Sequence, residues 1–235
     1  MSALAAVPDL AENPAMSAIS QASDLRESAV IDPGSRILAV DSSLIELLPD
    51  RGLRRGSTIA IGDTPGAMSL TLTLLAAPMD TGAWAAVMGL PEFGVIAATD
   101  FGIPLHHLAL VPDPGDTWLE ATAALLDSID IVVLAPPRRC KASDARRLSA
   151  RARQRGSVLI ICPPAHTPHR ANTPCWPESA DIELTVRDNE WQGMQCGHGR
   201  LRNRELDIVA SGRRLAGPAR HAHLQWGQQQ WNLGA

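Results

Sequence analysis

The sequence predicts an α/β fold: a mostly parallel sheet flanked by helices, with antiparallel strands at its C-terminal side. Between residues 58 and 162, short apolar runs of strand length alternate with helical patterns. This alternation is typical of a parallel sheet with helices on its faces. Between residues 181 and 210 the helical patterns stop, and alternating strand patterns follow one another. A length of 235 residues with 45% apolar content favours one core domain.

We divide the chain into three segments. Residues 1–35 are rich in Ala and Ser, offer at most a helix over 15–29, and are predicted to be a flexible N-terminal arm. Residues 36–215 contain the expected core domain. Residues 216–235 are predicted to be a polar tail, because Gln and Trp dominate them and no core-forming period is present.

The expected elements of the core follow in order. Residues 37–48 are weakly helical, and a turn at 49–56 leads into a first strand at 58–61. A buried helix follows, and we expect Pro78 to end it because proline interrupts helices. The further expected strands are Ala83–Met88, His107–Val111, Ile129–Leu134, Ser157–Cys162, Asp181–Arg187, Glu190–Gln195 and Arg204–Ala210, the last three antiparallel. The further expected helices are Pro91–Asp100, Thr117–Ser128 and Ser143–Gln154.

The turn between the first strand and the buried helix has the spacing of a phosphate-binding loop, G-x-x-x-x-G-K-[ST]. In that motif backbone amides surround phosphates, a lysine reaches the β- and γ-phosphates, and a hydroxyl holds Mg²⁺. Counted from Gly62, Ala67 stands at the second glycine, Met68 at the lysine and Ser69 at the hydroxyl. The hydroxyl is present and the cation is absent.

The missing cation predicts a protein that does not hydrolyse ATP. A methionine contributes no charge, and the single lysine of the chain is Lys141. Phosphoryl transfer depends mostly on positioning and electrostatics, so losing the positive group removes a main catalytic contribution. We therefore expect no catalytic residue and no cofactor. The alternative is an ordinary strand-to-helix turn. The residues of the vestigial phosphate loop are Gly62, Gly66 and Ser69.

The charge of the chain is divided unevenly. Residues 1–130 have five Arg against 17 Asp and Glu, a net −12, whereas residues 131–235 have 16 Lys and Arg against eight Asp and Glu, a net +8. The whole chain is at −4. This split indicates a polar contact surface in the second half.

The cysteines and the apolar runs indicate the compartment of the protein and whether it binds a metal ion. Four cysteines without C-x-x-C spacing are typical of a reducing cytoplasm. No apolar run approaches 18 residues and no basic n-region begins the chain, so we expect neither a membrane span nor an export signal. A zinc set is also not expected, because the spacing of its candidate ligands is irregular. Those candidates are Cys162, His166, His169 and Cys175.

On these motifs the chain resembles the RecA-like superfamily. In that family an aspartate at the end of a later strand helps to bind Mg²⁺, but the strand after Asp130 ends here in Ala135. The catalytic glutamate of the family aligns near Leu90, with Glu92 two places away. Where the family has a sensor glutamine, this chain has Pro163 and Pro164. With Met68, these departures indicate a RecA relative that does not hydrolyse ATP.

Within the superfamily, the degenerate loop and the Trp-containing tail are most similar to the ImuA-prime family. That resemblance implies a non-catalytic accessory protein of error-prone translesion synthesis, induced by DNA damage in the SOS response. It implies a cytoplasmic protein that associates with the nucleoid after damage. Its implied partners are an ImuB-type Y-family-like protein and, indirectly, an error-prone C-family polymerase. Two alternatives remain: an ATP-binding switch without hydrolysis, and a cell-division inhibitor resembling SulA.

Two further segments are candidates for contacts. A dense basic stretch lies where the DNA-facing loop of RecA relatives is expected, so direct and salt-sensitive phosphate contacts are predicted, with a solvated helix face as the alternative. The tail contains two tryptophans, which are typical of docking to a partner, with incidental residues of a disordered end as the alternative. These candidates are Arg138, Arg139, Lys141, Arg146 and Arg147 in the basic stretch, and Trp226 and Trp231 in the tail.

Overall fold

The computed structural model describes residues 36–137, 140–163, 176–195, 198–215, 217–227 and 230–233, without the side chains of 193–202 and 226–233. The strands are β1 Ile37–Leu38, β2 Leu53–Arg54, β3 Thr58–Ile61, β4 Ala85–Met88, β5 Leu108–Val111, β6 Ile131–Leu134, β7 Val158–Ile161, β8 Ile182–Gln195, β9 His198–Ser211, β10 Arg220–Gly227 and β11 Gln230–Leu233. The α-helices are α2 Ala67–Asp80, α3 Val95–Asp100, α4 Trp118–Ser128 and α5 Ala142–Arg155, and the 3₁₀ helices are η2 Ser42–Leu44, η3 Leu105–His107 and η4 Gly115–Thr117.

Among the described residues, nine strands form one sheet in the order β11-β10-β9-β8-β3-β7-β6-β4-β5. The six strands from β5 to β8 in that order pair in parallel, and β9, β10 and β11 continue the sheet in antiparallel pairs. The predicted α/β class, with a mostly parallel sheet and antiparallel strands at the C-terminal side, is confirmed. The strand before the loop, β3, lies inside the sheet between β7 and β8.

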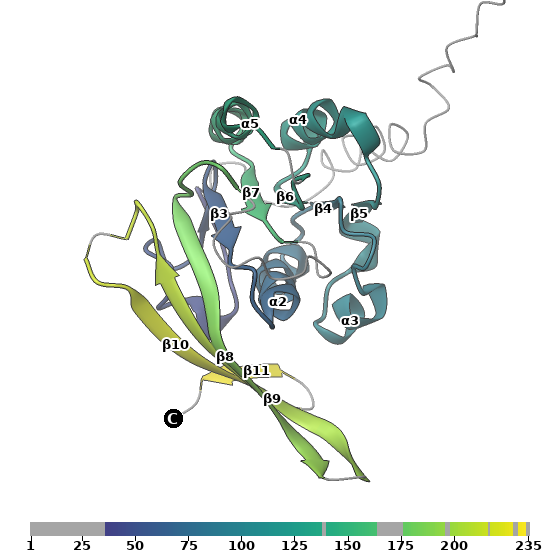
Figure 1. Ribbon diagram of the computed structural model, residues 1–235, viewed down its shortest axis with the longest axis vertical. Coiled ribbons are helices and arrows are strands. Elements are labelled where there is room, and N and C mark those ends of the chain that lie inside the picture. The colour runs from purple at the N-terminus through teal and green to yellow at the C-terminus, as the bar shows by residue number, and fades with distance from the viewer. Residues whose placement is uncertain are drawn as a thin grey trace, which may run out of the picture.

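Helices cover both faces of the parallel part (Figure 1). On one face α2 and α3 pack against the sheet through side chains such as Leu70, Leu74 and Ala98, together with Ile59 of β3. On the other face α4 and α5 pack through Leu125 and Leu148 against β6 and β7. The apolar faces of both helix pairs are therefore buried against the sheet, as this layer architecture requires.

Expectations about three parts of the chain are wrong. Residues 37–48 are not helical at their start, because β1 pairs antiparallel with β2, and only η2 follows. Pro78 does not end α2, which continues to Asp80. A proline in the last turn costs few helical hydrogen bonds, and Thr81 closes the helix by donating from its hydroxyl to the carbonyl of Pro78 at 2.8 Å.

The third correction concerns the C-terminal strands. The two expected strands Asp181–Arg187 and Glu190–Gln195 are one continuous strand, β8, with a register shift between Val186 and Asp188. A β-bulge absorbs the extra residue without ending the strand. The start of β8 pairs in parallel with β3, although we expected it to be antiparallel. Its partner β9 begins at His198, six residues before the expected start.

The segment predicted as a polar tail, residues 216–235, includes β10 and β11 of the main sheet. Leu224 of β10 is fully buried in the core. No helix among the described residues is both long enough and apolar enough to cross a membrane.

Candidate functional site

The phosphate-loop-like turn connects β3 to α2 and is held tightly against β8 and β9. Gly66 precedes α2 with a φ of 105°, and a Cβ atom there would lie 3.1 Å from Cδ2 of Leu206 and 3.2 Å from Cγ1 of Val186. At Gly62 a Cβ atom would lie 2.8 Å from Oγ1 of Thr185. Both glycines therefore allow a close approach between the turn and the neighbouring strands.

The amides of the turn are largely used within the protein. The amide of Gly62 donates to the carbonyl of Leu184 at 2.8 Å, that of Thr64 to the carbonyl of Gly62 at 2.9 Å, and that of Ala67 to the carbonyl of Thr64 at 3.1 Å. Pro65 has no amide hydrogen to donate. These are donors that a phosphate-binding loop directs at its ligand, so this turn has fewer of them available for phosphate.

The two motif positions at the start of α2 have protein partners. Met68, at the lysine position, is half-buried and packs against the core. Ser69, at the hydroxyl position, accepts a hydrogen bond from the Nη1 atom of Arg204 on β9. The hydroxyl that would hold Mg²⁺ in an active loop is therefore bound to a cation of the protein itself.

Arg204 has two further partners, both on the adjacent strand β8. Its Nε atom donates to Oδ1 of Asn189 at 2.7 Å, and its guanidinium lies over the ring of Trp191, 4.4 Å from the centroid. Burial lowers the pKa of Arg204 from its ordinary value. Sequence reasoning did not identify Arg204, which is 135 residues from Ser69 in the chain.

The other degenerate motif positions lie among apolar groups. Ala135, directly after β6, is buried, and a Cβ atom on Gly89 would lie 2.7 Å from its carbonyl oxygen. Leu90, at the position of the catalytic glutamate, is 2% exposed in the core. Pro164 lies outside the described residues. The two positions where the family has a carboxylate, Ala135 and Leu90, thus have apolar side chains here.

The described candidates of the basic stretch lie exposed at the start of α5. Arg138 and Arg139 lie outside the described residues. Lys141 directly precedes α5, and Arg146 and Arg147 are exposed on that helix. Arg146 donates from Nε to the carbonyl of Ala142 at 3.2 Å.

Two other arginines of α5 bind one carboxylate on α4. Arg151 donates from both Nε and Nη2 to Asp127, and Arg155 donates from Nε to the same carboxylate at 3.0 Å. The hydrogen bond from Arg151 is the largest cause that lowers the pKa of Asp127. These two arginines therefore join α5 to α4, and the local sequence pattern gave no sign of their partner.

The remaining candidates have separate positions. Trp226 and Trp231 face each other in the register of β10 and β11, and their side chains lie outside the described residues. His166, His169 and Cys175 also lie outside them. Within the described part of the chain no group of three or more potential ligands could hold a metal ion. Cys162 is buried, and the hydroxyl of Thr71 donates to its sulfur at 3.4 Å.

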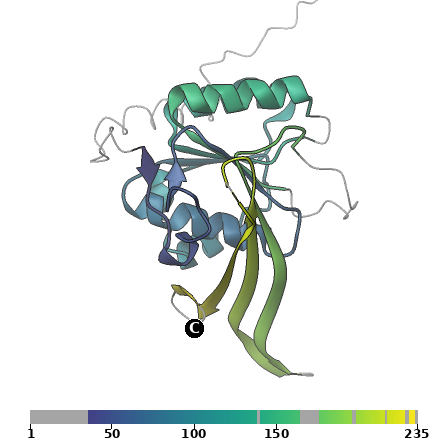
Figure 2. The same ribbon diagram turned by 90° about the vertical axis from the view of Figure 1, so that its left-hand side faces the viewer.

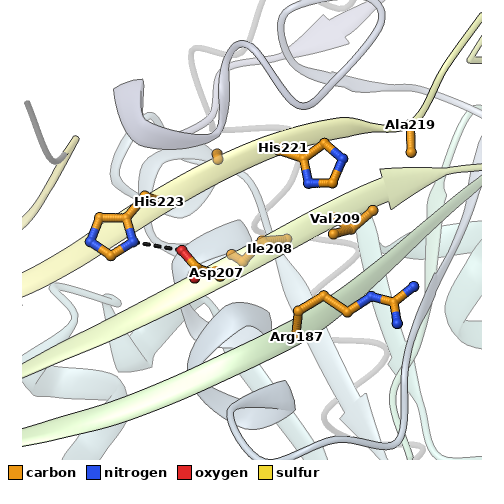
Figure 3. Close-up of a pocket in the computed structure, with 8 residues that line it drawn as sticks. Arg187, Asp207, Ile208, Val209, Ala219, His221 and His223 are labelled. Atoms are coloured by element: carbon orange, nitrogen blue, oxygen red, sulfur yellow. Dashed lines mark hydrogen bonds and ion pairs between the residues drawn. The ribbon is translucent and has the colours of Figure 1, made fainter.

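A hollow that sequence reasoning missed lies on the outer face of β8, β9 and β10 (Figure 3). Its volume is about 610 Å³, and it is lined by Arg187, Asp207, Val209, Ala219, His221 and His223, with Ile208 and Ala222. Nδ1 of His223 lies 2.6 Å from Oδ1 of Asp207. The alternation of His221 and His223 along β10 was the available signal, because alternate residues of a strand share a face.

The fold and the turn define the class of protein. It is an α/β protein with a mostly parallel sheet, and its phosphate-loop-like turn lacks the lysine and contacts an arginine of the protein itself. The chain belongs to the MT3502 N-terminal domain family, whose model matches residues 46–169. It is similar to the uncharacterized protein Rv3395c of Mycobacterium tuberculosis, with 41% identity over 102 residues. That match covers 43% of this chain and 50% of the relative, so the chain spans about half the length of the relative it matches.

Proposed function

We propose that the protein is a non-catalytic interaction module whose phosphate-loop-like turn has become a structural joint. The observation that supports this most directly is the hydrogen bond from Arg204 to the hydroxyl of Ser69. Three loop amides that donate to protein carbonyls add to it. A nucleotide with Mg²⁺ would have to displace these contacts before it could bind as in an active loop.

The residues at the other motif positions agree with this proposal. Hydrolysis of a nucleotide needs positive groups on the phosphates, a carboxylate that helps to hold the metal, and a group that orients the attacking water. The corresponding residues here are Met68, Ala135 and Leu90. Each is apolar and half-buried or buried, so these three positions offer no group for the three roles.

For the biological role, we propose the one that the resemblance implies. In this proposal the protein is a RecA-like accessory factor of damage-induced, error-prone translesion synthesis. It holds an ImuB-type protein, and through it an error-prone C-family polymerase, in the cytoplasm and on the nucleoid after damage. A central position of β3, with parallel strands on both sides, is compatible with descent from a nucleotide-binding fold.

Nucleotide binding is the first test of this proposal. Purified wild-type protein and a Met68→Lys/Ala135→Asp variant are titrated with a fluorescent ATP analogue and assayed for phosphate release. We expect no saturable binding and no turnover by the wild-type protein. Saturable binding that Gly66→Trp abolishes would replace the proposal with an ATP-binding switch, and turnover at an ordinary rate would overturn it.

The biological role needs a separate test in cells. Deleting the gene should lower the frequency of damage-induced mutations, and the wild-type gene should restore it. Filamentation on expression, with unchanged mutation frequency, would instead indicate a cell-division inhibitor. Partner binding is tested by co-purification with the ImuB-type protein.

The tail is better tested by point substitution than by truncation. Removing residues after 215 would also remove β10 and its buried residue Leu224. Trp226→Ala and Trp231→Ala variants that still fold and still bind the partner at wild-type affinity would show that these tryptophans are not the docking residues.

A further inference from the structure

The sheet ends at β5, whose outer edge has no partner strand among the described residues (Figure 1). In Figure 2 the parallel part of the sheet has α5 on one face and α2 on the other, so both of its faces are covered. On its inner side β5 pairs in parallel with β4. Its four residues include neither a charged residue nor a proline. A free apolar edge of this kind is a template for pairing with another strand.

The backbone groups that point to this edge follow from the pairing with β4. The amide of Gly89 donates to the carbonyl of Val111 at 2.9 Å, so Val111 directs its backbone groups toward the β4 side. Successive residues of a strand direct these groups to opposite sides, so those of Leu108 and Leu110 point to the free edge. The amide of Leu108 already donates to the carbonyl of Leu105. Leu110 therefore offers both an amide and a carbonyl to a new strand.

Exposed apolar side chains are concentrated around the same edge. Of the six exposed large apolar side chains of the described residues, four lie between residues 95 and 110. Val95 and Ile96 are on α3, Leu105 is on η3 and Leu110 is on β5, and Ile96 is 80% exposed. The short helix η3 leads directly into β5 and contacts α3. We call these four residues the edge patch. Such patches are typical of surfaces that bind another protein.

We propose that two copies of the protein associate through this edge, with β5 of one copy pairing antiparallel with β5 of the other about a two-fold axis. Leu110 of one copy then lies opposite Leu110 of the second copy, and the two residues exchange a pair of amide–carbonyl hydrogen bonds. The interface is isologous, because the same surface is used on both copies. Such a dimer goes beyond the proposed function and does not depend on it.

A second copy fits this edge better than an extended peptide does. Because β5 has four residues and Pro112 follows it directly, a peptide strand would gain few hydrogen bonds, and these alone give little affinity. A second copy also brings its own edge patch. Leu108 packs in the core cluster that contains Ala98 of α3, and Leu110 shares that face of the strand. A two-fold axis perpendicular to the sheet keeps α3 of both copies on this face, so the two patches bury each other.

The charges that flank β5 favour the antiparallel orientation. Asp113 and Asp116 follow the strand and are exposed, whereas His106 and His107 precede it. In a parallel pair the aspartates of the two copies would lie side by side, and like charges opposite each other are destabilising. In the antiparallel pair they lie at opposite ends of the joint. With Leu110 on the axis, Asp113 lies opposite His107 of the second copy.

The association is tested by sedimentation velocity of the full-length protein over a range of micromolar concentrations. We expect a species of twice the chain mass of 25.1 kDa, whose fraction rises with concentration. Leu110→Lys should raise the dissociation constant about tenfold or more, because it sets two ammonium groups opposite each other. Ile37→Lys is the matched control: Ile37 is 41% exposed, against 39% for Leu110, and lies in the separate sheet of β1 and β2. It should leave the constant unchanged.

The backbone contribution is tested with Leu110→Pro and Leu110→Ala. Proline removes the outward amide and is tolerated on an edge strand whose N–H points away from its neighbour, whereas alanine keeps that amide. Association should therefore be weaker in the proline variant than in the alanine variant. Circular dichroism shows whether each variant is folded. Hydrogen exchange of the wild-type protein needs no variant, and the Leu110 amide should exchange more slowly as the protein concentration rises.

Three outcomes would overturn this dimer: a monomer at every concentration, equal loss of association in Leu110→Lys and Ile37→Lys, or protection of the Leu110 amide that does not change with concentration. The last would show that another segment of the same chain covers the edge. None of these measurements involves a nucleotide or a partner protein, so the proposed function can stand when the dimer fails.

Discussion

Arg204 of β9 donates a hydrogen bond to the hydroxyl of Ser69 in the first turn of α2. In a working phosphate loop a hydroxyl at this position holds a metal ion. Here it joins α2 to the base of the antiparallel hairpin formed by β8 and β9. The contact gives the Ser69 hydroxyl a structural role in this turn, which has Met68 at the lysine position.

Removing this contact should lower stability in a graded way. Ser69→Ala leaves Arg204 with Asn189 and Trp191, so we expect a loss of about 1 kcal/mol in the free energy of unfolding. Arg204→Ala also removes packing over the ring of Trp191 and should cost about 2–3 kcal/mol. Urea unfolding of both single variants and the double variant measures their coupling. Strictly additive effects would contradict a direct interaction.

Gly66→Ala should destabilise the protein through both backbone and packing. Its φ is 105°, and an added Cβ atom would lie within 3.1–3.3 Å of Leu206 and Val186. We expect a cost of about 2–4 kcal/mol. Gly102→Ala is the matched control, because Gly102 has a φ of 77° and nothing within 4 Å of the added atom. The cost of Gly102→Ala should be only the backbone contribution, about 1–2 kcal/mol. If thermal unfolding gave equal costs for the Gly66 and Gly102 variants, the packing argument would be wrong.

The ion pair between Arg55 and Asp130 should be important for stability. The two atoms are 2.8 Å apart, the Asp130 side chain is 1% exposed, and it also accepts from the amide of Trp84 at 3.0 Å. Asp130→Ala leaves a nearly buried guanidinium without this carboxylate and should cost about 3–5 kcal/mol.

An exposed ion pair of similar length provides the comparison for Asp130. Arg51 and Glu46 are 3.0 Å apart, with side chains 70% and 69% exposed. Arg51→Ala should change the free energy of unfolding by less than about 1 kcal/mol. If chemical denaturation gave similar losses for the two variants, burial would not be the deciding factor.

His107 should make the protein less stable in mild acid. Its pKa lies below the ordinary value of 6.5, chiefly because burial disfavours the charged ring and also because His106 is adjacent. As the pH falls below about 6.5, His107 therefore binds a proton in the unfolded chain at a higher pH than it does in the folded protein. The free energy of unfolding should decrease from this pH downward until the folded-state pKa is passed.

Replacing His107 tests the origin of that decrease. His107→Gln should flatten the pH dependence of stability just below pH 6.5, measured by urea unfolding. Asp127 has a pKa lowered from 3.8, so the stability that it contributes is lost only below that pH. Its titration therefore does not overlap with that of His107. An unchanged slope in the variant would assign the effect to another group.

Part of the fold follows from local patterns alone. Strand and helix patterns between residues 58 and 162 predicted the parallel core, because each buried strand there is a short apolar run between amphipathic or polar helices. The helix around Leu70 was predicted, although its end at Pro78 was wrong. The two strands expected after Asp181 are one strand, because the bulge lies at Arg187 and Asp188 and Asn189, which separated the expected strands, both pair with β9.

The candidate site, too, could be predicted from the sequence only in part. Met68 at the lysine position and Ala135 at the end of β6 are visible in the sequence, because motif spacing is local. The partners of Asp127 on α5 and the position of Trp191 beside Arg204 are not visible. They depend on which helices pack together and on the register of β8 against β9.

The sequence by itself determined that a glycine turn without a lysine stands between a buried strand and a helix, since residue identity and spacing need no fold. Only the tertiary structure decided what occupies the hydroxyl of Ser69. Arg204 reaches it because β8 pairs in parallel with β3 and β9 returns antiparallel along β8. Strand order and register are set by burial over the whole sheet, and local propensity does not specify them.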